Sequence, residues 1–342
     1  PLQTSTSTMV KPNIMFILDD SGSMDSDYLP DWADSSNAAL FKNAGFNGVY
    51  YDPAIRYSPP LDYKGDSWAS TTSNWTSVRN DAYRIQSTSS SDLTTGTNKA
   101  QYYTFIPGEF CTAKNLRTCV AQSAKSATYP EPAILRWCND SALTDCQAAR
   151  IEANTTGGKT YLYPRYPGYS SGKNTVALTV TQAGKNSQLS SLLVDGQQIM
   201  GSTASISASS TSNMASAIAA SINQCTSAVA GNCTIAGYSA SVNNSKVTIT
   251  APVSLNGVTL ATTLGSTGAS ISVGSFSGSG TYVPGSNVLT EIVSTQTSYT
   301  YPGSTTKASA RDDCAGTTCT YNEEMTNYAN WWTYYRTRMQ MM

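Results

Sequence analysis

The hydrophobic and polar positions near the start of the chain predict a buried strand. Residues 14–18 are five consecutive apolar residues, Ile-Met-Phe-Ile-Leu, with no alternation between two faces. Such a run indicates a strand covered on both sides, as in the centre of a parallel sheet flanked by helices. Acidic and hydroxyl side chains follow at once, beginning with Asp19. Because ligands of open α/β sheets bind beyond the carboxyl ends of the strands, the pattern predicts an α/β domain with a site at this point.

The other end of the sequence predicts an amphipathic helix. Thr320 and Glu323 are spaced as a capping box, which marks a helix start. Apolar residues then recur every three or four positions, at Met325, Tyr328, Trp332, Tyr335, Met339 and Met342. This stripe needs another element to cover it. Because it continues to Met342 without a Gly or Asn stop, we expect the chain to end before its fold is complete.

A third pattern, over residues 174–277, predicts a small α+β module. Polar and apolar residues alternate through Val176, Leu178 and Val180, as in a half-buried strand. Two hairpins are expected, turning at Asp195-Gly196 and at Asn243-Asn244. Between the hairpins, one helical face carries Met214, Ile218, Ile222 and Cys225. We therefore expect one helix on one side of an antiparallel sheet.

The remaining stretches show little periodicity. Residues 25–173 are rich in Tyr, Trp, Pro, Ser and Asn, and only residues 140–151 suggest a short helix. We interpret this stretch as an aromatic, disulfide-containing insertion and residues 278–313 as a linker returning from it. The predicted α/β domain is then formed by residues 10–24, its first strand, and residues 314–342, its first helix.

The cysteines predict disulfide bonds. Eight cysteines fall into four sequence-local pairs: Cys111/Cys119, Cys138/Cys146, Cys225/Cys233 and Cys314/Cys319. An even number at short spacings indicates an oxidising compartment. Zinc binding requires closer Cys-x2-Cys spacings or histidines, and the sequence has no histidine.

Composition and charge exclude several classes of partner. The formal net charge is -1, which gives no reason to expect a nucleic acid or an acidic membrane as partner. Charged residues make up 13% of the chain, about half the usual share of roughly 25%. No run of about 18 apolar residues is present, so no transmembrane segment is expected.

The loop after the first predicted strand is a candidate metal site. Asp19, Ser21 and Ser23 form a D-x-S-x-S pattern. One carboxylate and two hydroxyls are oxygen ligands that suit a hard cation, Mg2+ or Ca2+. The alternative is structural, because Asp and Ser commonly form turns and helix caps.

Three blocks of sequence resemble one protein family. The block "KPNIMFILDDSGSM" resembles the first strand and metal-ion-dependent adhesion site of a von Willebrand factor A domain. The blocks "FNGVYYDPAIRYSPP" and "RDDCAGTTCTYNEEMTNYANWWTYYRTRMQMM" resemble the N-terminal region of the PilY/PilC type of type IV pilus tip-associated proteins. The resemblance implies a von Willebrand factor A-like (Rossmann-type) α/β domain, incomplete in this chain and interrupted by a large insertion.

The same resemblance implies a function and a location. Proteins of this type are adhesins at the pilus tip that also support pilus assembly and are exported through the periplasm. The expected partners are minor pilins of the tip and a host or surface receptor, either protein or glycan. Asp19, Ser21 and Ser23 match the family's adhesion-site motif, which implies a bound divalent metal.

A group of aromatic residues admits two interpretations. Aromatic side chains often anchor protein or glycan contacts, so the group is a candidate receptor surface. The general burial of aromatic residues instead favours a small internal core. The group consists of Trp32, Tyr50, Tyr51, Tyr57, Trp68 and Trp75.

Two alternative functions remain open. One is a secreted hydrolase that uses the acids of the first loop, Asp19, Asp20, Asp25 and Asp27; paired-carboxylate chemistry needs two facing acids, which neighbours on one loop seldom provide. The other is a structural pilus spacer. We expect a binding protein rather than an enzyme, and an Asp19→Ala variant separates the three hypotheses by its effect on adhesion, on turnover or on neither.

Overall fold

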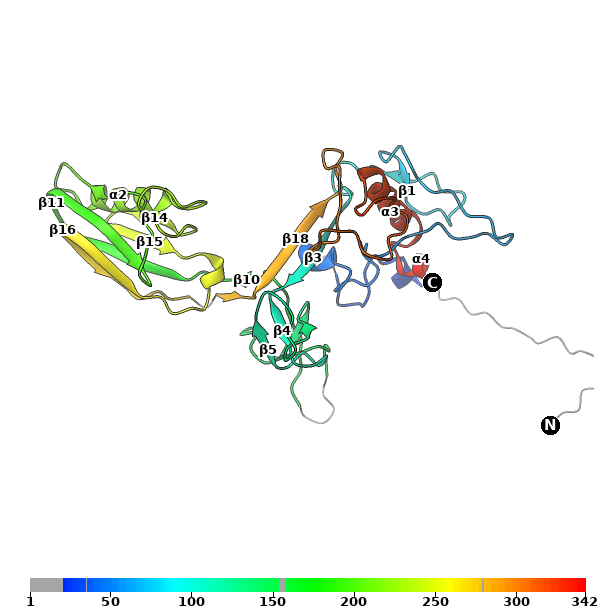
Figure 1. Cartoon of the computed structure of the whole chain (residues 1–342), viewed down its shortest axis with the longest axis horizontal. Helices are drawn as coiled ribbons and strands as arrows, with labels where there is room; N and C mark the ends of the chain where they lie inside the picture. The colour runs from blue at the N-terminus through cyan, green and yellow to red at the C-terminus, as the bar shows by residue number, and fades with distance from the viewer. Residues whose placement is uncertain (1–20, 35, 154–157, 279) are drawn as a thin grey trace, which may run out of the picture. The chain divides into compact units, whose positions relative to one another are not determined.

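The chain forms two compact units. The computed structural model describes residues 21–34, 36–153, 158–278 and 280–342. Unit 1 is formed by Pro1–Thr104 with Val288–Met342, and unit 2 by Phe105–Asn287 (Figure 1). Strands β3 (Gln101–Pro107) and β18 (Gly285–Glu291) pair with each other where the chain passes from one unit to the other. The stretch expected as one insertion, residues 25–173, is therefore divided between the units.

The predicted fold class is wrong. Among the described residues, strand (29%) exceeds helix (13%), and the sheets are curled and antiparallel, so this is not a Rossmann-type α/β fold of the von Willebrand factor A kind. In the described part of the chain, each strand pair whose residue-by-residue pairing is defined is antiparallel. The physical reason lies in the strand sequences, because the strands Thr175–Val194 and Lys246–Thr250 alternate between buried and more exposed residues, a pattern common in antiparallel sheets. The all-apolar run that suggested a parallel sheet, residues 14–18, lies outside the described residues.

Unit 1 surrounds one long helix, α3 (Tyr321–Tyr334), with short elements and loops. The short elements are η1 (Gly22–Asp25), α1 (Ala38–Phe41), β1 (Val78–Arg79), β2 (Ser90–Ser91) and α4 (Arg338–Met341). The start of α3 is the predicted capping box: Glu323 N–H donates to Thr320 Oγ1 at 3.3 Å, and Thr320 N–H donates to Glu323 Oε2 at 2.7 Å. The prediction of this helix start is confirmed.

The predicted helix does not continue unbroken to Met342. α3 ends at Tyr334, and Thr337 caps the separate helix α4 through a second capping box with Gln340. Burial also differs from the predicted stripe, because ten of the fourteen residues of α3 are buried. Trp331, which lies off the predicted stripe, is one of them. A helix that is buried on all sides does not show the single apolar stripe from which an amphipathic helix is predicted.

The polar side chains of α3 hold the surrounding loops. Trp331 Nε1–H donates to Val49 O at 2.9 Å, and Tyr334 O–H donates to Ala69 O at 2.7 Å. Asn327 Nδ2–H donates to Ile55 O at 2.9 Å. A buried loop carbonyl that is not paired within a β-sheet needs a side-chain donor of this kind, because an unpaired buried carbonyl destabilises the fold. This requirement explains the Asn-, Trp- and Tyr-rich sequence of the helix.

A buried ion pair fixes the start of α3. Arg311 donates to Glu324 Oε2 at 2.7 Å, and the two side chains are 1% and 2% exposed. Tyr51 O–H donates to the other oxygen of Glu324 at 2.8 Å. Burial opposes the charge of Arg311, but Tyr51, Asp313 and Glu324 outweigh it and raise the pKa of the guanidinium. The pair thus joins residues 51, 311 and 324, which are far apart in sequence.

Unit 2 contains two small disulfide-bonded sheets. Their strand orders are β5-β4-β6 and β8-β7-β9. The strands are β4 (Glu109–Cys111), β5 (Cys119–Ala121), β6 (Glu131–Pro132), β7 (Arg136–Cys138), β8 (Cys146–Gln147) and β9 (Tyr163–Arg165). The short helix expected over residues 140–151 is absent, since strand β8 and its disulfide hold part of this segment extended.

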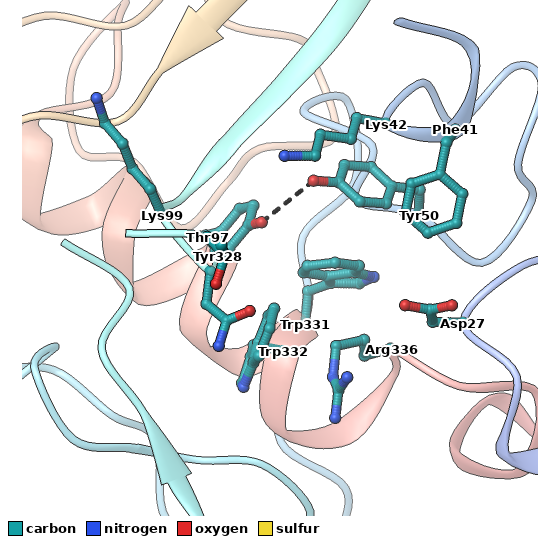
Figure 2. A pocket seen from close by; sticks show the side chains of 11 residues that line it. Asp27, Phe41, Lys42, Tyr50, Thr97, Lys99, Tyr328, Trp331, Trp332 and Arg336 are labelled. Carbon is teal, nitrogen blue, oxygen red and sulfur yellow. Dashed lines mark hydrogen bonds between the residues drawn. The ribbon is translucent and has the colours of Figure 1, made fainter. Parts of the chain in front are cut away.

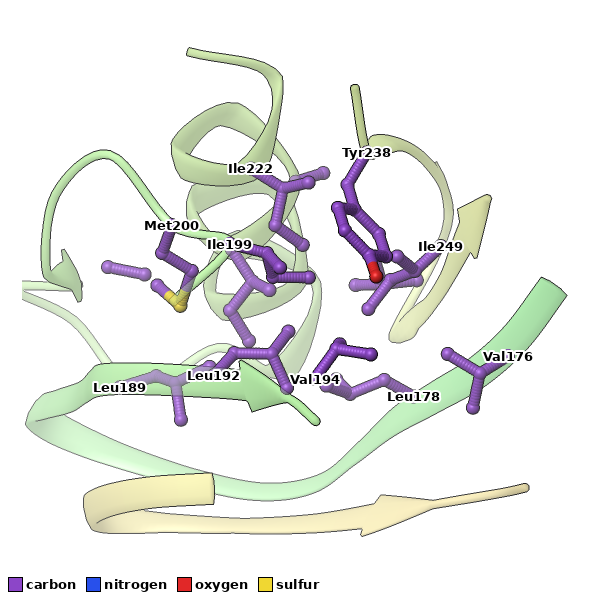
Figure 3. Close-up of a cluster of buried hydrophobic side chains, with 14 of the residues drawn as sticks. Val176, Leu178, Leu189, Leu192, Val194, Ile199, Met200, Ile222, Tyr238 and Ile249 are labelled. Atoms are coloured by element: carbon purple, nitrogen blue, oxygen red, sulfur yellow. The ribbon is translucent and has the colours of Figure 1, made fainter. Parts of the chain in front are cut away.

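The rest of unit 2 is a curled antiparallel sheet with helix α2 (Thr211–Asn223) on one face (Figure 3). Its strands are β11 (Thr175–Val194), β12 (Gln197–Gln198), β13 (Ala204–Ser205), β14 (Ser239–Asn243), β15 (Lys246–Thr250) and β16 (Thr262–Val273). The turn η2 (Val253–Leu255) and the pair β10 (Ser170–Ser171) and β17 (Thr281–Tyr282) complete the unit. In Figure 3, side chains of β11 point toward α2, among them Leu178 and Leu192.

Most local predictions in this sheet are confirmed. α2 buries Met214, Ile218 and Ile222, as its periodicity predicts. The turn at Asp195 and Gly196 is present, with φ of 47° and 78°, the left-handed values that an Asp-Gly hairpin turn adopts. The second hairpin turns at residues 244–245, one residue later than predicted, because Asn243 pairs with Lys246.

One long strand replaces the two strands expected before Asp195. β11 runs for 20 residues, and its pairing with β16 shifts register at three points. Between Leu189 and Leu192 the buried positions change from odd to even numbers, where the register shifts between Leu189 and Ser191. An irregularity of this kind turns the following side chains to the other face and bends the strand. The curl lets both halves of β11 face the same helix.

Candidate functional site

The predicted metal ligands are only partly described. Asp19 lies outside the described residues. Ser21 precedes helix η1 and Ser23 lies within it, and their hydroxyl oxygens are 3.0 Å apart at an exposed position. Among the residues that the structure describes, no group of three or more His, Cys, Asp or Glu side chains could hold a metal ion. Binding of Mg2+ or Ca2+ by Asp19, Ser21 and Ser23 stays a prediction.

The acids proposed for hydrolysis are also partly described. Asp19 and Asp20 lie outside the described residues. Asp25 forms an exposed ion pair with Arg84 at 3.0 Å. Asp27 lies elsewhere, in the lining of a pocket beside α3. The two described acids therefore occupy different surroundings.

The four predicted disulfides are confirmed. The bonds are Cys111–Cys119, Cys138–Cys146, Cys225–Cys233 and Cys314–Cys319. In the first two, the bonded cysteines are directly opposite each other on paired strands. Two ion pairs also support the small sheets of unit 2, because the Glu109 carboxylate accepts from both Arg136 and Arg165. These features stabilise a loop-rich fold.

The six candidate receptor aromatics all pack within unit 1. Tyr50 and Tyr51 are buried, and the other four, Trp32, Tyr57, Trp68 and Trp75, are partly buried. Tyr50 lies against Trp331 with ring centroids 5.0 Å apart, and Tyr51 lies against Tyr328 at 4.9 Å. The structure thus brings the two adjacent tyrosines to the central helix. Receptor contact by the group stays a prediction.

A pocket of about 130 Å3 lies beside α3 in unit 1 (Figure 2). Its aromatic lining is Phe41, Tyr50, Tyr328, Trp331 and Trp332. Its charged lining is Asp27, Lys42, Lys99 and Arg336, with Thr97 and Asn98 beside Lys99. We call it the aromatic-cationic pocket. It is built from α1, the loop after it, the loop before β3, and the end of α3.

The polar atoms of the aromatic lining are already paired. Tyr50 O–H donates to Gln101 O at 2.8 Å, Trp331 donates to Val49 O, and Trp332 Nε1–H donates to Asn80 Oδ1 at 2.9 Å. Burial raises the pKa of Tyr328 to about 12 and that of Tyr50 well above its usual value. These phenols therefore stay neutral at physiological pH. Tyr50, Tyr328, Trp331 and Trp332 are each at most 8% exposed, so they form the wall of the pocket and little of their ring surface is accessible.

The cations of the pocket differ in how well they are paired. Lys99 forms an ion pair with Glu291 at 2.8 Å. Arg336 lies over the ring of Trp332, with its Cζ 4.4 Å from the ring centroid. The Nε atom of Arg336 is buried without a hydrogen-bond partner among the described residues. Burial lowers the pKa of Lys42 and of Arg336. The pocket thus contains partly desolvated positive charge, and Asp27 and Asp81 favour the charged form of Arg336.

Sequence reasoning did not identify this pocket. Tyr50 was a candidate contact residue and Asp27 a candidate acid, but neither was connected to Lys42, Lys99 or Arg336. The three cations are separated in sequence and none belongs to a motif. The available signal was Trp331, an aromatic residue that lies off the apolar stripe of its helix. An aromatic residue at such a position indicates that a second face of the helix is also buried.

In the ranges that the structure describes, no helix has both the length and the apolar character that crossing a membrane requires.

One comparison with known proteins gives a partial likeness. Type IV pilus biogenesis factor PilY1 of Pseudomonas aeruginosa (strain UCBPP-PA14) is 29% identical to this chain over 126 residues, which cover 31% of the chain. The chain spans 11% of the length of that protein. No protein-family model matches the chain, and no solved structure matches it. The likeness therefore concerns part of each sequence.

Proposed function

We propose that this chain is part of a type IV pilus-associated adhesin on the bacterial surface. The observation that carries the proposal is the similarity to part of PilY1. The four disulfides support it, since they suit a protein exported through the periplasm to the cell exterior. In this proposal the chain binds rather than catalyses: its partners are minor pilins at the pilus tip and a protein or glycan receptor.

The geometry that supports binding is the aromatic-cationic pocket. A recess with aromatic walls and a few charged groups is typical of ligand sites. The buried phenols stay protonated near neutral pH, because burial raises the pKa of Tyr328 to about 12 and that of Tyr50 well above its usual value. The pocket is therefore suited to holding a ligand.

A deletion strain tests the proposed function. Cells lacking the gene should carry fewer surface pili and attach less to host cells or surfaces, and the wild-type gene should restore both. Pili are counted by electron microscopy and attached cells by plating. Unchanged piliation and unchanged attachment would contradict the proposal. Reduced piliation with normal attachment per piliated cell would favour the structural spacer.

We also propose that Asp19, Ser21 and Ser23 bind Mg2+ or Ca2+. An octahedral shell with Mg–O bonds of about 2.0–2.1 Å places neighbouring oxygens about 2.9 Å apart. The 3.0 Å separation of the two serine hydroxyls is compatible with that shell. Calorimetric titration of the chain with each cation tests the site: binding should disappear in Asp19→Ala and persist in Asp62→Ala, a partly exposed acid in another loop. Equal binding by Asp19→Ala and the wild type would reject it.

A further inference from the structure

We propose that two copies of this chain associate through β16, which pairs antiparallel with β16 of the second copy and joins the two curled sheets of unit 2 into one. The inference goes beyond the proposed function and does not depend on it, because it concerns unit 2 alone. It follows from three properties of β16: its open edge, its composition, and the match between its two halves.

β16 lies at an open edge of the curled sheet. It pairs with β11 along one side, from Thr262 opposite Val194 to Val273 opposite Leu178 (Figure 1). Among the residues that the structure describes, no other strand pairs with β16. None of its twelve residues is fully buried. An edge strand presents backbone N–H and C=O groups without partners, and such a row is a template for one more strand.

The composition of β16 does not prevent pairing with a copy of itself. Charged side chains and proline on edge strands are common means by which proteins avoid edge-to-edge association. β16 contains neither, so two copies place no like charges opposite each other. The other edge strands of the sheet, β12, β13 and β14, have only two to five residues. β16 is therefore the longest open edge of the described sheet.

The apolar residues of β16 lie on the face of the sheet that packs against the core. Leu264, Ala269, Ile271 and Val273 are partly buried there. Leu264 has an even number and the other three have odd numbers, so the alternation changes between the two halves of the strand. The change occurs around Gly268, whose φ is 73°, a left-handed value that marks an irregular point in a strand.

This change of alternation makes the strand complementary to itself. Directly opposite residues of an antiparallel pair point to the same face. With a two-fold axis between residues 267 and 268, the two strands pair along their whole length and each core-facing apolar residue in one half meets the other half of the second copy. The opposite residues are then Thr262 with Val273, Thr263 with Ser272, Leu264 with Ile271, Gly265 with Ser270, Ser266 with Ala269 and Thr267 with Gly268.

The faces and the length select this register. A shift by one residue would set Leu264 opposite Ser270 or Ser272, which lie on the other face. A shift by two residues would keep the faces but leave the strand ends unpaired. In the selected register Leu264 meets Ile271 of the second copy twice, and apolar side chains that are partly exposed in one chain become covered. The contact is the same on both copies, so it closes as a dimer and does not extend into a fibre.

Sedimentation velocity of the full chain over a concentration series tests this inference. We expect the fraction of dimer to rise with concentration. Hydrogen exchange measured by mass spectrometry should slow in β16 over the same series, because backbone groups at its open edge become paired. Sedimentation as a monomer at every concentration would overturn the inference, and so would dimers in which exchange in β16 does not slow.

Two double variants test the register. Thr263 and Ser272 are both exposed, and the register sets each opposite the other in the second copy. Thr263→Lys with Ser272→Lys sets like charges opposite each other twice and should raise the dimer dissociation constant about tenfold at low salt. Thr263→Lys with Ser272→Glu sets opposite charges there and should dimerise at least as tightly as the wild type. Equal dimerisation by the two variants would overturn the inference.

A control variant separates position from added charge. Ser227→Lys with Ser241→Lys adds two positive charges to exposed positions of unit 2 outside β16, and should dimerise as the wild type does. Dimerisation weakened to the same degree in this control as in Thr263→Lys with Ser272→Lys would show an effect of net charge alone and overturn the inference. Equal melting temperatures by circular dichroism, at concentrations where the wild type is monomeric, show that the variants are folded.

Discussion

The helices of the two units have similar lengths but opposite kinds of core. α2 of unit 2 has 13 residues and buries only small, apolar and hydroxyl side chains against a sheet. α3 of unit 1 has 14 residues and buries Glu, Asn and Thr among its aromatics. A sheet satisfies its own backbone, so the helix covering it can be purely apolar. Loops leave backbone carbonyl groups without partners, so a helix surrounded by loops must donate hydrogen bonds to them. Its buried side chains must therefore include polar groups as well as large apolar ones.

The largest expected effect is in the core of unit 1. Replacing Glu324 by Ala leaves Arg311 buried and unpaired, and we expect the free energy of unfolding of unit 1 to fall by about 3–5 kcal/mol. Urea unfolding followed by tryptophan fluorescence measures the loss. This signal reports mainly on unit 1, which contains five of the six tryptophans, Trp32, Trp68, Trp75, Trp331 and Trp332.

Two further variants make the test specific. Arg56→Ala breaks an exposed ion pair with Asp312, whose side chain is 70% exposed, and should change stability by at most about 1 kcal/mol. A double variant, Arg311→Met with Glu324→Leu, removes both buried charges and should recover much of the stability lost in Glu324→Ala. If Glu324→Ala is no less stable than Arg56→Ala, the pair does not stabilise unit 1.

The core of unit 2 should respond to lost volume rather than lost charge. Leu192 of β11 is fully buried in the core of unit 2, which includes side chains of α2. Leu192→Ala should lower the free energy of unfolding of unit 2 by about 2–5 kcal/mol. Hydrogen exchange measured by mass spectrometry assigns the loss to its unit: amides of α2 and β15 should exchange faster, and those of α3 should not. Faster exchange in α3 as well would show that the two cores unfold together.

The disulfide beside α2 should have a smaller effect. Cys225 and Cys233 close a short loop, with a sequence separation of 8. Replacing both by Ala should destabilise unit 2 by about 2–3 kcal/mol, since a short closed loop removes little entropy from the unfolded chain. Thermal unfolding by circular dichroism, compared with the Cys314→Ala, Cys319→Ala variant of unit 1, checks this value. No change in melting temperature in either variant would contradict it.

The smallest effect near neutral pH concerns the tyrosines. Burial raises the pKa of Tyr57 and Tyr328 in unit 1, and of Tyr238 in unit 2, to about 12. A phenol with a raised pKa keeps its proton longer in the folded state. Its contribution to stability is complete below pH 10 and is lost as the pH rises through about 12.

Because unit 1 also buries Tyr50, Tyr51 and Tyr102, whose pKa values are raised well above 10, we expect its stability to fall more steeply above pH 10 than that of unit 2. Tyrosinate absorbance and tryptophan fluorescence, recorded together during an alkaline titration, follow ionisation and the unfolding of unit 1. If the amides of unit 2 lose their protection from hydrogen exchange at a lower pH than those of unit 1, the prediction is wrong.

The fold of unit 2 was more predictable than that of unit 1. The helix with Met214, Ile218 and Ile222, the Asp195-Gly196 turn and the cysteine pairs were all apparent from the sequence, because each depends on neighbours within a few residues. The fold class was not: one apolar run led to a parallel sheet, whereas the pairing is antiparallel. The register shift near Leu189 was also hidden, since only the opposite strand reveals it.

The sequence by itself determined the four disulfides, the capping box of Thr320 and Glu323, and the elements of the small α+β sheet. Periodicity, turn residues and spacing carry that information over short distances. Only the tertiary structure decided that α3 is covered on all sides and that Lys42, Lys99 and Arg336 meet at one pocket. The physical reason is that the packing of loops on a helix depends on the sum of many weak contacts between residues distant in sequence, and no local pattern encodes that sum.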